Sequence, residues 1–307
     1  MRTAFVKELI EQGKKNDKIF LLVADLGFSV VEPFAELFPE RFLNVGIAEQ
    51  NMAGIATGLA MEGYNVYIYS IGNFPTLRCM EQIRYDICYH NVSVKIIAVG
   101  GGYAYASLGA SHHATEEIGM LRTIPNLTVC APGDPDEMRA ITRFSSTYAG
   151  PCYIRIGKAG EPEVHKKYSK IVEQIKPGDI LNVIDGSDVA VFSSGAMLEY
   201  SATYISQNKL KASLYSFPFV KPIDLSQLLS LFKKYKKIIT IEEHQAHCGF
   251  GSAILELMND LKENGQLDQA PAVKRIAINN AFYSKSGTQN YLRTIAGLEF
   301  KLSDFES

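Results

Sequence analysis

The stretch Val45-Gly46-Ile47-Ala48-Glu49-Gln50-Asn51 places a single acid in an otherwise uncharged segment. Small and apolar residues follow it as far as Ala60, and this run predicts a helix near residues 47–62. A carboxylate at the mouth of an apolar helix is costly to desolvate, so Glu49 favours its protonated form and suits an acid that donates or shares a proton. An acid that the helix dipole stabilises and that stays open to water is the other interpretation of this segment.

Short β-branched runs alternate with helical stretches on both sides of this segment. The predicted strands are residues 19–24, 66–70, 92–99, 127–130, 153–156, 189–193, 212–217, 237–241 and 273–278. The predicted helices are residues 47–62, 76–89, 135–148, 197–207, 225–235 and 251–263. Apolar strands separated by helices predict an α/β fold of mostly parallel sheets that helices cover on both faces.

A segment rich in Lys and Glu, from residue 160 to 178, lacks apolar periodicity and is typical of a linker. We therefore predict two domains, over residues 1–165 and 184–307, joined by a linker over residues 166–183. Each domain is expected to contain one mostly parallel sheet flanked by helices. A chain of 307 residues is long enough for two such domains.

Composition and charge narrow the class of protein. The hydrophobic fraction of 47% and the charged fraction of 21% are ordinary for a globular chain. The net charge of -2, without a Lys/Arg block, argues against a nucleic-acid partner. The chain opens on an amphipathic helix over residues 2–12, so we expect no signal peptide, no membrane segment and a cytoplasmic location.

Cysteines and histidines give no pattern that is typical of a metal site. The five cysteines are widely spaced and form no Cys-x-x-Cys pair, which favours reduced thiols. The pairs His112-His113 and His244/His247 lack enough nearby Cys, His or acidic ligands for a metal centre. We therefore expect no metal ligands on this chain.

Short motifs follow one another in a fixed order along nearly the whole chain. Those of the first half are Ala24-Asp25-Leu26-Gly27, Asn44-Val45-Gly46-Ile47-Ala48-Glu49-Gln50, Tyr69-Ser70, Gly109-Ala110-Ser111-His112-His113-Ala114-Thr115-Glu116, Leu121-Arg122-Thr123-Ile124-Pro125-Asn126, Ala131-Pro132-Gly133-Asp134 and Tyr153-Ile154-Arg155. That of the second half is Thr240-Ile241-Glu242-Glu243-His244, followed by Gly249 and Gly251. In this order the motifs resemble the pyrimidine-binding and C-terminal domains of transketolases.

The resemblance implies a thiamine diphosphate cofactor. In the family, the acid at the position of Glu49 hydrogen-bonds the pyrimidine ring nitrogen and favours the imino tautomer that activates the thiazolium carbon. Phe74 falls on an aromatic position that stacks on the pyrimidine, while Ile71 and Leu77 stand where well-known transketolases carry aromatics. The implied cofactor-binding residues are Glu49, Phe74, Ile71, Asp25 and Arg78.

The resemblance also implies a transfer of a two-carbon ketol unit from a ketose, or a ketose phosphate, to an aldehyde. His112 matches a family histidine beside the reacting carbons, and imidazole can give or take a proton near neutral pH. His113 is expected only to support it. The residues implied at the substrate phosphate are Arg2, Ser29 and Arg155, and arginine forks suit phosphate oxygens.

Two departures from the family pattern concern the substrate. A further family histidine falls in Gly100-Gly101-Gly102, where this chain has none. The family acid that recognises a substrate hydroxyl falls on Leu108. The sequence therefore leaves open a modified or nucleotide-linked sugar, or a different aldehyde acceptor.

The motif that binds the cofactor's diphosphate is missing. Transketolases hold Mg²⁺ there with Gly-Asp-Gly followed by Asn on a separate domain, whereas Gly133-Asp134-Pro135 and Gly178-Asp179-Ile180 both lack the second glycine. We therefore predict a separate diphosphate-binding subunit as partner, two copies of each chain, and the Mg²⁺ on the partner. The small residues Ala53, Gly54, Thr57 and Gly58 suit a close helix contact at that interface or, equally, within the chain.

Three alternatives stay open. The first is the β subunit of a 2-oxoacid dehydrogenase first component, which uses the same cofactor. The second is a deoxyxylulose-phosphate-synthase-like enzyme, which joins pyruvate to an aldehyde. The third is a non-catalytic binding subunit, against which Glu49 and His112 argue.

Overall fold

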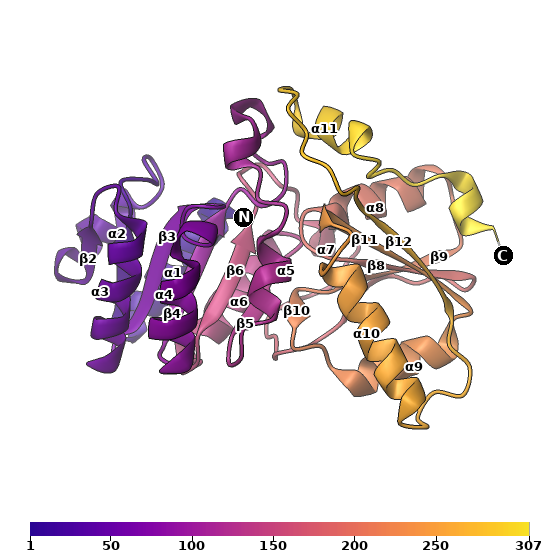
Figure 1. Cartoon of the computed structure of the whole chain (residues 1–307), viewed down its shortest axis with the longest axis horizontal. Coiled ribbons are helices and arrows are strands. Elements are labelled where there is room, and N and C mark those ends of the chain that lie inside the picture. Colours follow the sequence, from indigo (N-terminus) through magenta and orange to yellow (C-terminus); the bar gives the residue numbers. More distant parts are fainter. Residues whose placement is uncertain (307) are drawn as a thin grey trace.

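Two mostly parallel sheets organise the chain, and the computed structural model describes residues 1–306. The sheet of the first half and that of the second half lie side by side along the long axis of the molecule (Figure 1). Helices cover both sheets, so the predicted fold class of two α/β units is confirmed.

The first sheet contains seven strands. They are β1 (Ile19–Val23), β2 (Phe42–Asn44), β3 (Asn65–Ile71), β4 (Val94–Val99), β5 (Thr128–Cys130), β6 (Cys152–Ile156) and β10 (Phe219–Lys221). Their order is β10-β5-β6-β4-β3-β1-β2, and only β10 runs antiparallel to its neighbour β5. Strands β4 and β6 are buried along their whole length, which is why they stand out in the sequence as apolar runs.

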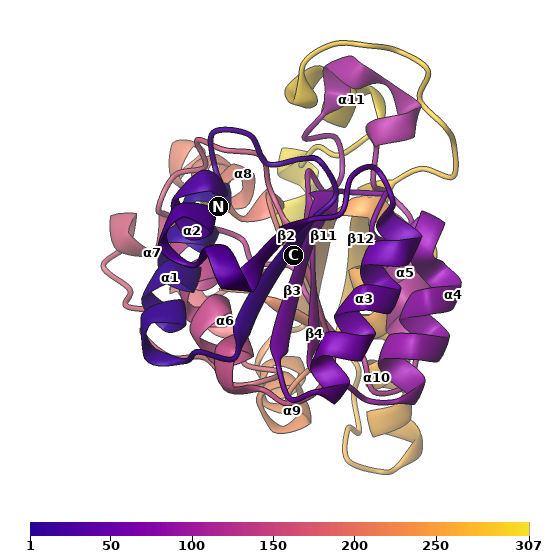
Figure 2. The same cartoon turned by 90° about the vertical axis from the view of Figure 1, so that its left-hand side faces the viewer.

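Helices lie on both faces of the first sheet. They are α1 (Arg2–Lys15), α2 (Glu32–Leu37), α3 (Glu49–Met61), α4 (Met80–Gln82), α5 (Glu117–Arg122) and α6 (Pro135–Thr147), and the short α7 (Val164–Lys167) follows them in the chain. Figure 2 shows α1 and α6 on one face of the sheet and α3 and α4 on the other. Sequence determines where α6 begins, because Pro135 follows Asp134, whose carboxylate accepts a hydrogen bond from the backbone of Glu137.

The second sheet contains five strands. They are β7 (Leu181–Ile184), β8 (Val189–Ser193), β9 (Ala212–Ser216), β11 (Lys237–Gln245) and β12 (Ala272–Ile278), in the order β12-β11-β8-β9-β7. Its helices are α8 (Met197–Gln207), α9 (Leu225–Lys234), α10 (Phe250–Glu263) and α11 (Gln289–Ile295). Figure 1 shows α8 on one face and α9 and α10 on the other. Across residues 1–306, no helix is both long enough and apolar enough to cross a membrane.

Some predicted boundaries differ from those observed. The helix expected over residues 76–89 is broken into a 3-10 turn (Leu77–Cys79), α4 and a π-helical segment (Ile83–Tyr89). Strand β7 begins at Leu181, inside the segment that we predicted as linker. Strand β10 comes from the predicted C-terminal domain but pairs with the first sheet. The sequence misses such short strands because three or four residues carry too little periodicity to be recognised.

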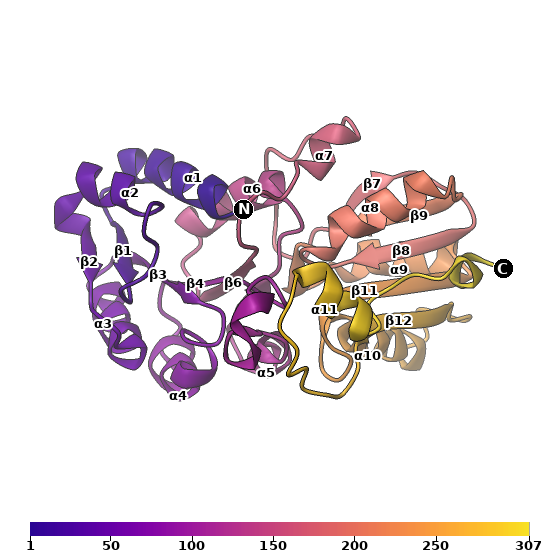
Figure 3. The same cartoon turned by 90° about the horizontal axis from the view of Figure 1, so that it is seen from above.

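An apolar core connects the two sheets. One continuous cluster of buried side chains runs from Val129 in the first sheet to Phe192 and Phe217 in the second half. The ring of Phe217 lies 4.8 Å from that of Phe192 and 5.0 Å from that of Phe250, measured between centroids. Figure 1 shows β10 between the two halves, and the view from above shows the two sheets side by side, with α5 and α11 near their junction (Figure 3). The two halves are therefore joined by packing as well as by the chain between them.

Truncation of Phe217 is expected to destabilise the junction. Phe217→Ala removes a fully buried ring and leaves a cavity, so we expect the free energy of unfolding to fall by about 3–5 kcal/mol. Urea unfolding followed by circular dichroism measures the change. Leu302→Ala, at a side chain that is 57% exposed, is the control and should change the free energy by less than about 0.5 kcal/mol. Equal effects of the two changes would contradict the shared core.

Candidate active site

The carboxyl ends of parallel strands gather the candidate residues at one edge of the first sheet. Asp25 follows β1, Phe74 follows β3, and the loop that carries His112 follows β4. Ligand sites of open α/β sheets form at this edge, because the loops that follow neighbouring strands meet there. The fold therefore brings together residues that are far apart in the sequence.

Glu49 is the first residue of α3, and its carboxyl group is buried beside a cation. The residue is only 3% exposed, and Arg78 Nη1 donates a hydrogen bond of 2.6 Å to Glu49 Oε2. Arg78 itself is about half exposed. The sequence indicated an acid in an apolar segment but not its partner, because Glu49 and Arg78 stand 29 positions apart in the chain and meet only in the folded structure. The pair compensates a charge that burial alone would penalise.

Beyond Glu49, the side chains of Arg78, Phe74 and His112 form a row in which each lies next to the following one. The Arg78 guanidinium lies 4.8 Å from the centroid of the Phe74 ring, and the Phe74 ring lies edge-on to His112 at 5.3 Å. An acid, an aromatic face and an imidazole thus stand next to one another. Arg78 makes contact with both groups, Glu49 and Phe74, that the sequence assigns to a bound pyrimidine ring.

The loop of His112 is held on several sides. Gly102 and Ala114 form an antiparallel bridge, and Asn73 Nδ2 donates to the carbonyl of His113 at 2.9 Å. Burial lowers the pKa of the His113 imidazole, which packs inside the loop. The His112 side chain stays half exposed, with Nδ1 3.0 Å from the Ser111 hydroxyl. Of the two histidines, His112 is therefore the one that a substrate can reach.

Asp25, Ser29 and Ile71 lie at the same sheet edge but make other contacts. Asp25 and Asn44 exchange two hydrogen bonds, and the Ser29 backbone donates to a carboxylate oxygen of Glu32 at 2.7 Å. Ile71 ends β3 and is half buried. Asp25 and Ser29 have positive φ angles of 50° and 61°, so the loop after β1 is tightly turned.

The two arginines expected at a substrate phosphate differ in their surroundings. Arg155 is 8% exposed: its Nε lies 2.9 Å from Glu117 Oε1, and its Nη2 donates to the carbonyls of Ala114 and Glu243. Its guanidinium therefore connects segments of the protein, a role that the sequence did not indicate. Arg2 is half exposed, and its buried Nε has no hydrogen-bond partner among residues 1–306.

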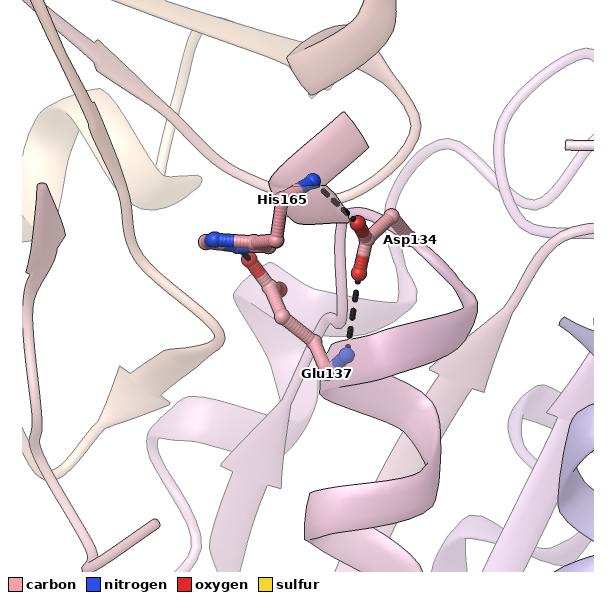
Figure 4. A group of neighbouring side chains, drawn as sticks. All are labelled: Asp134, Glu137 and His165. Carbon is pink, nitrogen blue, oxygen red and sulfur yellow. Dashed lines mark hydrogen bonds and ion pairs between the residues drawn. The ribbon is translucent and has the colours of Figure 1, made fainter. Parts of the chain in front are cut away.

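A second cluster of titratable groups lies in the segments that follow β5 and β6. Figure 4 shows Asp134 and Glu137 at the start of α6 and His165 in α7, all of them buried. Asp134 accepts hydrogen bonds from the backbone N–H groups of Glu137 and His165, and Glu137 Oε1 lies 2.7 Å from His165 Nε2. Glu137 Oε2 accepts from the backbone of Gly133. These are metal-ligating residue types, and their atoms are engaged in joining α6 to α7.

The sequence did not indicate this cluster, because His165 falls at the boundary between the predicted first domain and the predicted linker. Its pKa is raised: burial favours the neutral ring, but the hydrogen bond and charge of Glu137 more than offset that effect. Burial and the neighbouring Glu137 raise the pKa of Asp134 to about 6. Both shifts mean that the folded state holds protons more tightly than the unfolded chain does.

The chain is similar to known proteins along most of its length. Residues 1–160 match the family "Transketolase, pyrimidine binding domain", and residues 178–298 match "Transketolase, C-terminal domain". The chain is 30% identical over 299 residues to one subunit of the apulose-4-phosphate transketolase of Actinobacillus succinogenes, covering 96% of this chain and 93% of that protein. It is 34% identical over 265 residues to 1-deoxy-D-xylulose-5-phosphate synthase of Caldanaerobacter subterraneus subsp. tengcongensis, covering 84% of this chain and 41% of that protein.

A solved structure shares the fold along the whole chain. It is described as "Split gene transketolase, inactive beta4 tetramer", and it superposes with a TM-score of 0.82 at 34% sequence identity. The superposition covers 97% of this chain and 93% of that one. The similarity therefore includes both sheets and their junction.

The free energy of unfolding is expected to fall as the pH rises through the pKa values of Asp134 and His165, which join α6 to α7. His165 and Asp134 both have raised pKa values, so their contribution is complete at acidic pH, below the ordinary pKa of each group. It is lost as the pH passes about 6 and then the pKa of folded His165. Between pH 5.5 and 8.5 we expect a drop in Tm of about 2–4 °C, which is on the order of 1 kcal/mol for a chain of this size.

Glu137→Gln is the matched variant, because it keeps the shape of the side chain and removes the charge that shifts both groups. Scanning calorimetry across the pH range should give a flatter profile for Glu137→Gln than for the wild type. Parallel profiles would show that this cluster does not control the pH dependence.

Proposed function

The chain belongs to the transketolase family, and we propose that it is the C-terminal subunit of a split, thiamine diphosphate-dependent enzyme. The reaction is the transfer of a two-carbon ketol unit from a ketose or ketose phosphate to an aldehyde. The observation that carries this proposal is the row of contacts that leads from the buried carboxyl group of Glu49, through Arg78, to the Phe74 ring and the His112 imidazole.

These residues fit the pyrimidine half of the cofactor. Glu49 offers a buried carboxyl group to a ring nitrogen, and Phe74 offers a face on which an aromatic ring can stack. When bound, the cofactor supplies the nucleophilic carbon that attacks the ketose carbonyl. Arg78, which the resemblance gives as a cofactor-binding residue, covers Glu49 and the face of Phe74, and we propose that it turns toward solvent, where it is partly exposed, to admit the pyrimidine ring and then borders it.

His112 is the group that we assign to the reacting substrate. It lies beside Phe74, on a loop that several hydrogen bonds hold in place. A neutral imidazole can donate or accept a hydrogen bond with a substrate hydroxyl or carbonyl and can move a proton near neutral pH. Asp25 and Ser29, which follow the neighbouring strand β1, are proposed to border the same site.

The diphosphate and Mg²⁺ are proposed to lie on a partner chain. The sequence carries no Gly-Asp-Gly motif for them, and a diphosphate needs a divalent cation to balance its charge. The apulose-4-phosphate transketolase relative is itself one subunit of an enzyme, and this chain matches it along nearly its whole length, which supports such a division. We propose two copies of each subunit in the active assembly.

The exposed face of α3 is a candidate for that contact. Ala53 and Thr57 are buried, and the Thr57 hydroxyl donates to the Ala53 carbonyl, so packing within the chain accounts for both. Gly54 and Gly58 are exposed, and a Cβ added to either would meet no heavy atom within 4 Å. Packing within the chain does not require these two glycines, and we propose that they permit close approach of another chain.

The deoxyxylulose-phosphate-synthase-like reaction is the second candidate. The observation that favours it is the 34% identity to such an enzyme, which is as high as the identity to the split transketolase. The two reactions share the cofactor but differ in the donor, because pyruvate loses carbon dioxide and a ketose does not. The assembled enzyme with each donor separates them: ketol transfer without carbon dioxide release supports the proposed function. Carbon dioxide release with acyl transfer to lipoamide instead of to an aldehyde would identify a 2-oxoacid dehydrogenase β subunit, and an absence of turnover with every donor would support a binding role.

Loss of the Glu49 carboxyl group is expected to abolish turnover. When the chain is assembled with the proposed diphosphate-binding subunit and Mg²⁺, Glu49→Gln should lower kcat by at least about 100-fold, because a positioned acid contributes on that scale. Coupled measurement of the aldose and ketose products gives kcat. Glu62→Gln is the control, since it alters an exposed acid at the far end of α3 and should keep full activity. Retained turnover in Glu49→Gln would remove the assigned role.

A further inference from the structure

A tyrosine ring packs against Gly100, in the Gly100-Gly101-Gly102 segment where the resemblance places a further family histidine. Gly100 follows β4 with φ of +88°, and a Cβ built on it would lie 2.2 Å from both Cδ2 and Cε2 of Tyr105. No side chain fits at residue 100 while the Tyr105 ring is there. The missing histidine and the presence of Tyr105 are therefore one feature of the structure.

Tyr105 continues the row of rings that leads away from the cofactor residues. The Phe74 ring lies 5.3 Å from His112, and the Tyr105 ring lies 6.4 Å from His112, both edge-on at 69°. Since Phe74 also contacts Arg78, the pair Glu49–Arg78 marks one end of the row and Tyr105 the other. A substrate that reaches His112 therefore lies next to Tyr105.

Two cations approach the Tyr105 ring. Lys158 Nζ lies 5.6 Å from the ring centroid. Burial raises the pKa of Tyr105, and the nearby Arg2 guanidinium opposes this rise by charge and by hydrogen bonding. A phenol in these surroundings is a neutral hydrogen-bond donor at physiological pH, unlike an imidazole, which also takes up protons.

Within residues 1–306, neither Arg2 nor Lys158 forms an ion pair with a carboxylate, whereas Arg155 pairs with Glu117. Arg2 has a buried Nε without a partner among residues 1–306, and the Lys158 side chain is exposed. The Arg155 guanidinium is already used by Glu117 and by two backbone carbonyls. An anion at this end of the site would therefore meet Arg2, Lys158 and the phenol.

We propose that Tyr105 is a specificity-determining residue that binds an anionic oxygen group of the substrate together with Arg2 and Lys158. The inference rests on the proposed function, because it takes His112 as the residue beside the reacting carbons. The phenol donates a hydrogen bond to the anion, and the two cations balance its charge. The anion is the phosphate of a sugar phosphate or the carboxylate of a 2-oxoacid, and the choice of donor in the experiment separates these.

The test compares donors in the assembled enzyme. A ketopentose 5-phosphate, the unphosphorylated ketopentose and pyruvate are supplied to the wild type, to Tyr105→Phe and to Lys158→Gln. We expect Tyr105→Phe to lower kcat/KM for the anionic donor by about 10-fold, mainly through KM, as loss of a hydrogen bond to a charged group does. The value for the unphosphorylated sugar should change less than about twofold. Equal changes for all donors, or none, would overturn the inference.

Tyr103→Phe is the matched control. Tyr103 lies on the same loop, is buried, and packs against His113 and Tyr283, so its hydroxyl should not affect any donor. A wild type that uses no donor would refute the proposed function but not this inference. Calorimetric titration of the assembled complex with the ketopentose 5-phosphate then decides. Weaker binding to Tyr105→Phe than to the wild type supports the inference, whereas equal binding, or no binding to the wild type, refutes it.

Discussion

The buried guanidinium of Arg155 is the interaction on which the arrangement of the site depends. It pairs with Glu117 in α5 and donates to the carbonyls of Ala114, in the His112 loop, and Glu243, in β11. A charge that is 8% exposed must be compensated inside the protein, since an unpaired buried ion costs several kcal/mol. Arg155 therefore fixes the end of β6, the His112 loop and the second sheet relative to one another.

Glu243 extends this connection into the second half of the chain. One of its oxygens accepts a hydrogen bond from the backbone of Tyr103, and Arg293 of α11 binds both oxygens at 3.0 and 2.7 Å. Gly102 is needed at this contact, because a Cβ there would lie 2.5 Å from Glu243 Cγ and φ is +62°. The C-terminal sheet thus supports the loop of the N-terminal one, which gives a structural reason for the two domains to occur on one chain.

The ordered motifs and the longer apolar strands could be predicted from the sequence because each depends on local residue types. Strands such as β4 and β6 are buried on both faces, so their apolar runs are unambiguous. The short β10 could not be predicted, since its pairing with β5 depends on how the two halves pack. In the site, Glu49 stood out as an acid in an apolar segment, whereas its partner Arg78 belongs to another strand end.

The sequence by itself determined the family, the α/β class and the residue types at the edge of the first sheet. These follow from the order of the motifs and from the periodicity of apolar residues, both of which are evident without knowing any contact between segments. Only the tertiary structure decided which charged side chains form ion pairs. Arg155 pairs with Glu117, whereas Arg2 and Lys158 lie near Tyr105. It also filled the space at Gly100 with the Tyr105 ring. The reason is that pairing, burial and available volume are properties of distances between segments, and a linear sequence does not contain those distances.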